Sequence, residues 1–407
     1  MPVSPSKRRL AAFAVLTVSA ASLSACSAMG DADEPSGTPQ GRGVVASGSD
    51  AGAAKQAEPL LSINVGRGQT GVPVSTIVLV EADGGSLTSV RMSSSLGQVS
   101  GSISSDASSW SASERLEPGT TYTVAATARS DDEGEQARRT TQFTTQDLTL
   151  AQQTFASVAP LQGETVGVGM PVIVTFDLPV RNRAAFEKNM KVSSQPQQPG
   201  AWHWLDDDEA HWRPEKYWKA GTEVSVDIAV NGVDAGDGIY GQQDRAIDFT
   251  VGDANIYKVD AQTHQMKVFS NGELLRTIPI TTGKDGFTTR SGTKVIVEKF
   301  ASKRMNSETV GISGSEAYDI ADVQYAMRLT YSGEFIHAAP WSVGSQGSAN
   351  VSHGCTGMST EQARWLYDMS KRGDVVVYTG TDRPMTIDNG YGDWNLPFSA
   401  YARGSAL

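Results

Sequence analysis

One short run of residues in this chain has the types and spacing of a reactive thiol site. Cys355 ends the run Ser352-His353-Gly354-Cys355, and 14 residues separate His337 from Ser352. A free thiol is mostly protonated at neutral pH, and its thiolate is the nucleophile, so a reactive cysteine needs a base or a positive field. His337 could supply the base, while Gly354 lets a substrate approach and leaves the Cys355 N–H free as an oxyanion donor. The pattern indicates a nucleophilic cysteine with a histidine base.

The surrounding sequence predicts a mostly β domain with one helix. Asn271-Gly272 is a strong hairpin signal between strands predicted at 264–270 and 273–282. Further strands are predicted at 293–300, 325–331, 334–337 and 374–379. Ser359 opens the helix with Gln362 three residues on, Lys371-Arg372-Gly373 closes it, and Trp365, Leu366 and Met369 share one face. A helix starting soon after Cys355 is expected to add a favourable dipole at the thiol.

The N-terminus has the pattern of an export signal. A basic stretch at 7–9 precedes an apolar segment that is shorter than the roughly 20 residues needed to span a membrane. Leu23-Ser24-Ala25-Cys26 resembles a bacterial lipobox, which implies that residues 1–25 are removed and that lipid on Cys26 anchors the exported protein to the outer face of the cytoplasmic membrane. An ordinary signal peptide with a stray cysteine is the alternative. Residues 26–56 are rich in small and polar types, which predicts a flexible tether.

Composition excludes several classes of protein. Residues 1–25 carry three of the 34 basic residues and none of the 45 acidic ones, so the mature balance is 31 against 45, a net charge of −14. This acidity argues against a nucleic-acid partner. With Cys26 acylated, a single cysteine remains, which excludes a disulfide-stapled fold. About 350 residues follow the tether, enough for two to three domains.

An internal repeat predicts two immunoglobulin-like β-sandwiches, at 57–147 and 148–251. Trp110 lies nine residues before Gly119, and Trp212 lies nine before Gly221, 102 residues further on. Alternating strands follow each glycine, and a period near 100 residues suits such a sandwich. Both tryptophans are expected in the cores. The acidic run 206–209 is interpreted as a solvated loop rather than a calcium site, because no spaced ligand pattern accompanies it.

At its C-terminal part the chain resembles an actinobacterial L,D-transpeptidase with the YkuD-type catalytic domain. That family's signature is His, a gap of about 14 to 17 residues, Ser or Thr, His, Gly, Cys, an apolar residue and Asn. Other runs also resemble the family: Thr281-Thr282-Gly283-Lys284, Ser291-Gly292-Thr293, 337–342 and 392–397. The resemblance implies a catalytic domain at 252–380 and a C-terminal subdomain at 381–407, behind two immunoglobulin-like domains and a lipobox.

The resemblance also implies a reaction without a cofactor. Cys355 would attack the carbonyl between stem positions three and four of peptidoglycan, releasing D-alanine, and an acceptor amine from a second stem would complete a 3→3 cross-link. His337 would move the proton. Carbapenems would be inhibitors. Supporting roles fall to the Ala338 carbonyl (orienting His337), Tyr318 (a second oxyanion donor), Met305 and Trp341 (lining the groove), His353 (a supporting hydrogen bond), and Ser352 and Gly357 (the substrate side of the site).

The chain departs from the family signature at two positions. Thr356 replaces the apolar residue and Gly357 replaces the asparagine. Because that asparagine shapes the substrate side in the family, Gly357→Asn is expected to preserve or raise activity. The departures keep open a different class, a lipid-anchored cell-wall binding protein with weakened or divergent catalysis.

The same residues are compatible with two other kinds of site. His337, His353 and Cys355 could bind zinc, but a fourth ligand with suitable spacing is missing. A sortase would also order His before Cys, but it needs a catalytic arginine after the cysteine, and Arg364 and Arg372 belong to the predicted helix. The repeat further predicts separately folding domains, so that a fragment of residues 252–407 should fold and still be acylated.

Overall fold

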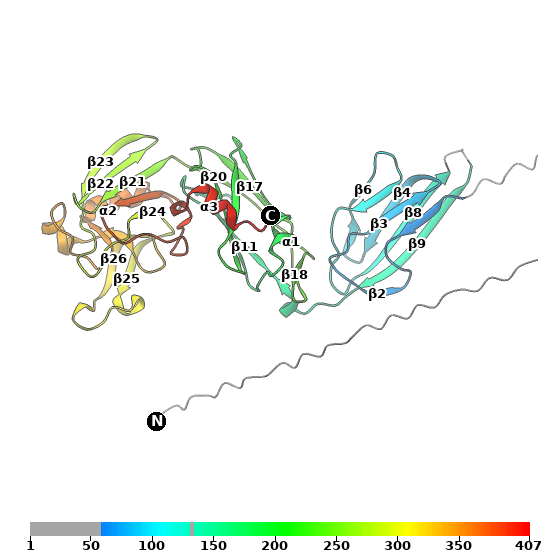
Figure 1. Ribbon diagram of the computed structural model, residues 1–407, viewed down its shortest axis with the longest axis horizontal. Helices are drawn as coiled ribbons and strands as arrows, with labels where there is room; N and C mark the ends of the chain where they lie inside the picture. The colour runs from blue at the N-terminus through cyan, green and yellow to red at the C-terminus, as the bar shows by residue number, and fades with distance from the viewer. Residues whose placement is uncertain (1–57, 131–133) are drawn as a thin grey trace, which may run out of the picture. The chain divides into compact units, whose positions relative to one another are not determined.

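The computed structural model describes residues 58–130 and 134–407, and Figure 1 shows their mostly β architecture. Cys26, the predicted signal peptide and the predicted tether lie outside the described residues. None of the helices in the described part is both long and apolar enough to cross a membrane.

Strands β1 to β9 form the first sandwich. Its two sheets have the orders β1-β3-β7-β6 and β2-β9-β8-β4-β5. The strands are β1 (Leu60–Ile63), β2 (Gln69–Val72), β3 (Leu79–Asp83), β4 (Gly85–Ser94), β5 (Gly97–Val99), β6 (Gly101–Ile103), β7 (Ser109–Ala112), β8 (Thr121–Ser130) and β9 (Gln136–Thr145). The alternating residues of both sheets point inward, and their core includes Trp110, Tyr122 and Phe143.

Strands β10 to β20 form the second sandwich. Its main sheets are β11-β13-β16-β15 and β12-β20-β17-β14, beside a small sheet β10-β19-β18. The elements are η1 (Leu150–Gln152), β10 (Gln153–Thr154), β11 (Ala156–Ala159), β12 (Thr165–Val166), β13 (Val172–Phe176), α1 (Arg183–Glu187), β14 (Met190–Gln195), β15 (Gly200–Trp204), β16 (Glu209–Pro214), β17 (Glu223–Ile228), β18 (Asp234–Gly236), β19 (Ile239–Gly241) and β20 (Arg245–Val251).

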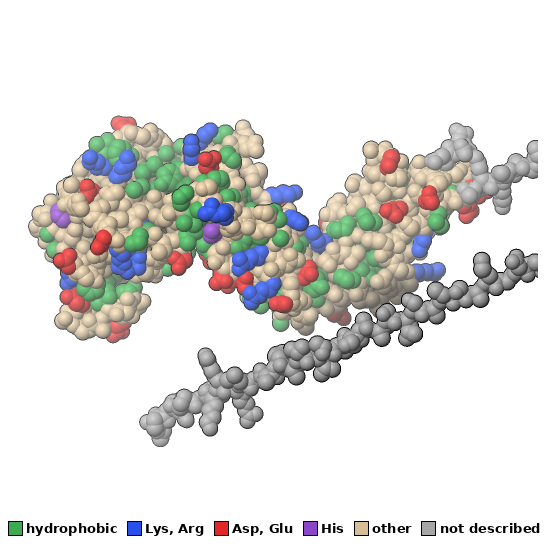
Figure 2. Space-filling view, viewed as in Figure 1, with side chains coloured by type: hydrophobic (Ala, Val, Ile, Leu, Met, Phe, Trp, Pro, Cys, Tyr) green, Lys and Arg blue, Asp and Glu red, His purple; other side chains and the backbone are tan. Residues whose placement is uncertain are grey.

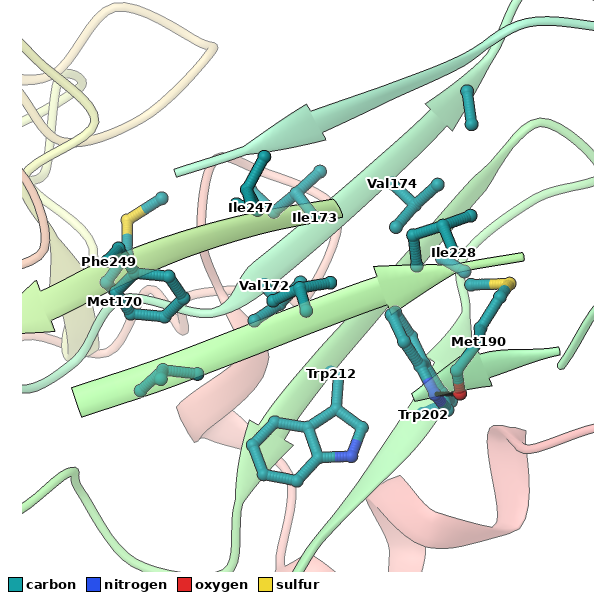
Figure 3. Packing of buried hydrophobic residues seen from close by; sticks show 14 of the residues in the cluster. Met170, Val172, Ile173, Val174, Met190, Trp202, Trp212, Ile228, Ile247 and Phe249 are labelled. Carbon is teal, nitrogen blue, oxygen red and sulfur yellow. Dashed lines mark hydrogen bonds between the residues drawn. The ribbon is translucent and has the colours of Figure 1, made fainter. Parts of the chain in front are cut away.

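The second sandwich has a core rich in tryptophan (Figure 3). Val172 and Val174 of β13 face Ile228 of β17 across the space between the sheets. The Trp202 indole donates to the Met190 carbonyl over 3.1 Å, so its polar edge is satisfied although it is buried.

The two repeat motifs occupy matching places in the sandwiches. Trp110 in β7 and Trp212 in β16 are both buried, as predicted. Gly119 and Gly221 adopt φ values of +58° and +78°, which explains why glycine opens the strand that follows each tryptophan. In the acidic run at 206–209, Asp207 forms ion pairs with Arg181 and Arg183.

The predicted catalytic domain packs a five-stranded sheet, β23-β22-β21-β29-β24, against a four-stranded sheet, β25-β26-β27-β28. Its elements are β21 (Asn255–Asp260), β22 (Gln265–Ser270), β23 (Glu273–Pro279), β24 (Gly292–Val295), β25 (Glu298–Asn306), η2 (Ser307–Val310), η3 (Gly314–Glu316), β26 (Asp319–Arg328), β27 (Phe335–Ala338), η4 (Pro340–Ser345), β28 (Thr356–Met358), α2 (Thr360–Met369) and β29 (Val375–Thr379).

Most strands and the helix of this domain lie where local sequence signals predict them, with shifts of a few residues at their ends. Asn271 and Gly272 have positive φ and join β22 to β23, as the hairpin signal predicts. Ser359 caps α2 by accepting from the Gln362 N–H over 3.3 Å. The strand predicted at 293–300 is wrong as a single element, because the buried residues Ile296 and Val297 carry the chain from one sheet to the other.

The C-terminal segment, residues 381–407, packs against the second sandwich. It contains η5 (Asp393–Asn395), α3 (Phe398–Tyr401) and η6 (Ala402–Gly404). The Trp394 indole donates to the Gly169 carbonyl over 2.8 Å, and Arg213, which is buried, donates to the Leu396 carbonyl over 2.9 Å. The Arg213 guanidinium also lies 4.4 Å from the centre of the Tyr401 ring.

One apolar cluster therefore spans the second sandwich and the catalytic domain. Val295, Val297 and Val375 belong to the same buried cluster as the sandwich core. Backbone hydrogen bonds of 2.8 Å join Gly167 to Arg372 and Gly169 to Gly373. The expectation that residues 252–407 fold alone does not follow from this structure, because the fragment would expose that part of its core.

A buried ion cluster sits at the same interface. His211 is inaccessible, with Nδ1 2.9 Å from Asp393 and Nε2 2.8 Å from Glu209, and the Tyr401 hydroxyl donates to Asp393 over 3.0 Å. Burial alone would lower the pKa of His211, but Asp393 and Glu209 outweigh it and raise the pKa to about 9. His211 is therefore charged at neutral pH.

We expect the His211 ion cluster to stabilise the fold at neutral pH and to lose this contribution at alkaline pH. Because its folded pKa lies above the unfolded value of about 6.5, its contribution is full below that value and is lost as the pH rises through about 9. The contribution is of order 3 kcal/mol. Urea unfolding of the wild type and of His211→Asn should show a difference in unfolding free energy that shrinks between pH 7 and pH 10; a constant difference would contradict the assignment.

The surface shown in Figure 2 carries basic and acidic side chains interspersed with apolar ones. Among the large apolar residues that are exposed, Trp341 and Val343 of η4 are 57% and 52% accessible. Both lie directly after the strand that carries His337, so this apolar surface borders the site described next.

Candidate active site

Two parallel strands bring the predicted base and nucleophile together. His337 lies in β27, Cys355 directly precedes β28, and the register pairs His337 with Gly357. Because neighbouring strands lie roughly 5 Å apart, the two side chains share one end of the sheet. Both are buried, with 6% and 8% of their surfaces accessible.

The turn before Cys355 is held by side chains of the motif itself. The Ser352 hydroxyl donates to the Cys355 carbonyl over 2.6 Å and accepts from the Gly354 N–H over 3.1 Å. Thr289 donates to the Gly354 carbonyl over 2.8 Å. Gly354 has a φ of +121°, a conformation that disfavours any side chain, so the glycine of the motif is required by backbone geometry.

His337 is held in a defined tautomer. Its Nδ1 lies 2.8 Å from the Ala338 carbonyl oxygen, which can only accept, so Nδ1 carries the proton and Nε2 presents a lone pair. Burial lowers the pKa of His337, with the Ala338 carbonyl acting in the opposite direction. The Trp341 ring stacks on the imidazole at a centroid distance of 5.8 Å. The imidazole is thus neutral at neutral pH, the state in which it can accept a proton.

The Cys355 thiol is also neutral at rest. Burial raises its pKa to about 12, with the Phe335 backbone and Lys294 lowering it and Glu334 raising it. Sγ lies 3.6 Å from the Gly333 carbonyl oxygen, the acceptor for the thiol proton. The expected helix dipole does not dominate here, because β28 separates Cys355 from α2 and the pKa is raised overall.

Both residues open into a cavity of about 260 Å³. All five residues predicted to contact substrate line it. The lining residues are Thr281, Met305, Tyr318, Ile320, Val323, His337, Ala339, Trp341, Ser342, Val351, Ser352, His353, Cys355 and Gly357. Ala338 and Gly354 are not among them; they act on the site through their backbones.

One wall of the cavity comes from the β25–β26 hairpin, drawn in yellow in Figure 1, which carries Met305 and Tyr318. Its η3 turn is tied to the motif: Glu316 lies 2.7 Å from His353 Nε2 and 2.7 Å from the Lys284 ammonium. Burial, with a smaller effect of Cys355, raises the pKa of Tyr318. Tyr318 and His353 rings lie 5.1 Å apart.

The structure can be compared with the two other interpretations of the site, a zinc site and a sortase. Residues 58–130 and 134–407 contain no group of three or more His, Cys, Asp or Glu side chains able to hold a metal ion. Arg364 is exposed and 3.8 Å from Asp368, and Arg372 pairs with Glu164 of the second sandwich. Neither arginine lines the cavity.

Gly357 requires a correction to the expectation from sequence. A Cβ at this position would lie 2.8 Å from Ala339 Cβ and 3.1 Å from Thr281 Cγ2. The asparagine of the family signature would therefore clash with the walls of this cavity. The structure favours glycine here because its neighbours close the space that a side chain would need.

We accordingly expect Gly357→Asn to lower the acylation rate rather than preserve it. Gly357→Ala should have a smaller effect in the same direction, because its single methyl group requires only a local shift. Overpacking of this kind costs about 1 to 3 kcal/mol. Acylation rates from intact mass, with thermal unfolding measured in parallel, provide the check. Equal or faster acylation by the asparagine variant would restore the original expectation.

Several residues near the site could not be found from local sequence. Thr281 hydrogen-bonds the Ala349 carbonyl and the Val351 N–H, both at 2.9 Å, fixing the loop before the motif. Glu316 binds His353 from a distant turn. Glu334 is buried beside the site between Arg290 and Lys294. These contacts join segments that are far apart in sequence, so local patterns do not predict them. Only Glu334 lies in an element predicted next to the site, the strand at 334–337.

Comparison with known proteins adds independent evidence. Residues 254–377 match the L,D-transpeptidase catalytic domain, YkuD, and residues 69–234 match a bacterial Ig domain. L,D-transpeptidase 2 of Mycobacterium tuberculosis (strain CDC 1551 / Oshkosh) is 39% identical over 352 residues, covering 86% of this chain and 85% of the relative. L,D-transpeptidase 5 of Mycobacterium tuberculosis (strain ATCC 25618 / H37Rv) is 33% identical over 345 residues, with 83% and 74% covered.

A solved structure of an LD transpeptidase, LdtMt1, in complex with imipenem has 38% identity, a TM-score of 0.49, and covers 55% of this chain and 98% of its own. The matches cover most of each sequence relative, and both relatives are named as L,D-transpeptidases. The chain belongs to the L,D-transpeptidase family and is a peptidoglycan L,D-transpeptidase, an acyltransferase.

Proposed function

We propose that the enzyme forms 3→3 cross-links through a thioacyl-enzyme on Cys355. The observation that carries the proposal is the neutral pair itself: a buried thiol and a buried imidazole with a free Nε2 open into one cavity. No cofactor is needed, because the reaction exchanges one acyl bond for another.

In the acylation step, Cys355 Sγ attacks the carbonyl between stem positions three and four. His337 Nε2 takes the thiol proton as the S–C bond forms, and returns it to the departing amine as the C–N bond breaks. D-alanine leaves, and the first three residues of the stem remain as a thioester. The thiol must turn from the Gly333 carbonyl toward His337 for this transfer.

In the second step, the side-chain amine at position three of another stem attacks the thioester. His337 accepts the amine proton as the C–N bond forms and passes it to the sulfur as the C–S bond breaks, so that an amide is made and the thiol is regenerated. The Cys355 N–H and the Tyr318 hydroxyl are the proposed donors to the oxyanion of both tetrahedral intermediates. Tyr318 lines the cavity, and its raised pKa keeps it protonated as a donor.

Substrate would be held along the apolar walls of the cavity. Met305 and Trp341 would contact the stem peptide, while Ser352 and His353 keep the turn and the hairpin in place through their hydrogen bonds. The strained amide of a carbapenem offers Cys355 the same kind of acyl carbonyl, so we propose carbapenems as covalent inhibitors at this thiol.

The function is tested by the product. The enzyme should convert a muropeptide with a tetrapeptide stem into a dimer whose tandem mass spectrum places the bond between two residues at position three, with one D-alanine released per bond. A dimer linked through position four would refute the 3→3 assignment. Absence of both a dimer and an acyl-enzyme would favour the cell-wall binding alternative.

We also propose that the enzyme works at the outer face of the cytoplasmic membrane, anchored through lipid on Cys26. The lipobox-like run Leu23-Ser24-Ala25-Cys26 after a short apolar segment supports this placement. We expect Cys26→Ala to move the protein from the membrane fraction to the soluble fraction, with Ser27→Ala as the matched control that stays. If the Cys26 variant remains wholly with the membrane, the anchor lies elsewhere.

A further inference from the structure

A buried cluster of charges lies behind the nucleophile and has no place in the reaction just described. Glu334 is 4% accessible and forms ion pairs with Lys294, which is fully buried, and with Arg290 at 2.9 Å. The Arg290 backbone N–H also donates to Glu334 over 3.1 Å. Two cations and one carboxylate give the cluster a net charge of +1.

Glu334 sits between the two backbone groups that hold the sulfur atom. The Gly333 carbonyl accepts from Cys355 Sγ, and the Phe335 backbone makes the hydrogen bond that favours the thiolate. The Glu334 backbone is itself fixed, since its N–H donates to the Thr330 hydroxyl over 2.9 Å. Holding the Glu334 side chain from two sides therefore fixes the segment that cradles Sγ.

The cluster continues to the residue after the nucleophile. The Lys294 ammonium lies 3.7 Å from the centre of the Tyr378 ring, and the Tyr378 hydroxyl is 2.6 Å from the Thr356 hydroxyl. Thr356 is the position where the family signature has an apolar residue. The Thr356 hydroxyl therefore links the residue next to Cys355 to the charged cluster through Tyr378, a contact that an apolar side chain could not make.

Stability alone does not account for such a cluster. Burying charges costs desolvation that their attraction often fails to recover, and apolar replacements of similar size are frequently as stable. A thiolate forming in the same dry region, however, interacts strongly with nearby charges. The ionisable groups that act on Cys355 or line its cavity are Lys294, Tyr318, Glu334, His337, His353 and Tyr378. Arg290 contacts Glu334.

We propose that Glu334, Lys294 and Arg290 are positioning residues: their ion pairs hold the 333–335 segment against Sγ, and Lys294 offsets the Glu334 charge that opposes the thiolate as it forms. Glu334 raises the pKa of Cys355, and Lys294 lowers it by a smaller amount. Burial lowers the pKa of Lys294 to about 8, so the lysine is charged at pH 7. The inference rests on Cys355 as the nucleophile.

The test measures alkylation of Cys355 by iodoacetamide at pH 7, followed by peptide mass mapping. It needs no peptidoglycan substrate, so it can fail independently of the proposed function. Glu334→Gln raises the net charge to +2 and Lys294→Met lowers it to zero. A shift of about one unit in thiol pKa changes the thiolate fraction about tenfold, and the opposing change in nucleophilicity leaves about threefold in rate.

We therefore expect Glu334→Gln to be alkylated about threefold faster than the wild type, and Lys294→Met about threefold slower. The double variant restores the net charge and should return close to the wild-type rate. Lys299→Met removes a half-buried lysine that binds the Tyr367 and Ser370 carbonyls away from the cavity, and it should leave the rate unchanged.

A purely structural role would move both single variants in the same direction, and that result would overturn the inference. No change in either variant would overturn it as well. Near-UV circular dichroism checks that each variant is folded. If Lys294→Met does not fold, Glu334→Gln and the double variant decide: an equal acceleration in both would contradict the electrostatic role.

Discussion

Replacing Cys355 with alanine is expected to abolish acyl-enzyme formation completely, because no other group of the cavity can form the thioester. His337→Ala should keep the thiol but slow acylation by about 10² to 10⁴, the usual range for general-base assistance. The thiol is protonated at neutral pH, so it depends on His337 for its ionisation. Stopped reactions with a tetrapeptide donor or a carbapenem, analysed by intact mass, give both rates.

His353→Ala serves as the matched control for the second histidine. It loses the contact with Glu316 but leaves Nε2 of His337 in place, so its effect should be smaller than that of His337→Ala. Wild-type rates in the His337 variant would sink the assignment of the base. If His353→Ala is acylated more slowly than His337→Ala, His353 rather than His337 would be the general base.

The second large effect concerns stability. A fragment of residues 252–407 should unfold at a much lower temperature than a fragment of residues 148–407, or fail to fold. It would expose the apolar side chains that the catalytic domain shares with the second sandwich, such as Val295 and Val375. It would also lose the ion pair between Asp393 and His211, which joins the C-terminal segment to the second sandwich.

Thermal unfolding by circular dichroism, with carbapenem acylation as a test of the active site, compares the two fragments. Arg213→Ala in the full chain is a milder version of the same change, because Arg213 binds Leu396 and stacks on Tyr401. It should lower the unfolding temperature without removing the nucleophile. Equal unfolding temperatures for the two fragments would show that the catalytic domain is independent after all.

Sequence reasoning succeeded where the signal is local. The Ser352-to-Cys355 run, the Asn271-Gly272 hairpin and the Ser359 cap depend on residues within a few positions of one another. The equal spacing of Trp110 and Trp212 from a glycine likewise reports one strand and its turn. Such patterns carry their own geometry, so the sandwiches and the catalytic motif could be predicted.

The errors came from contacts between distant segments. The shared core of the second sandwich and the catalytic domain joins residues such as Val172 and Val375, whose sequences alternate like those of any strand. The space around Gly357 is set by Ala339 and Thr281, which a signature pattern does not describe. The Lys294–Glu334 pair is likewise formed between strand β24 and the residue that precedes β27, in two different sheets. Tertiary packing, not local propensity, decides these features.

The central claim is that Cys355 forms a thioester with a stem peptide while His337 carries the proton. Its most direct measurement is the intact mass of the enzyme mixed with a tetrapeptide donor in the absence of an acceptor, followed by peptide mapping. We predict a mass increase equal to the donor minus one D-alanine, located on Cys355 and missing in Cys355→Ala. An adduct on another residue, or an adduct that retains the D-alanine, would contradict the account.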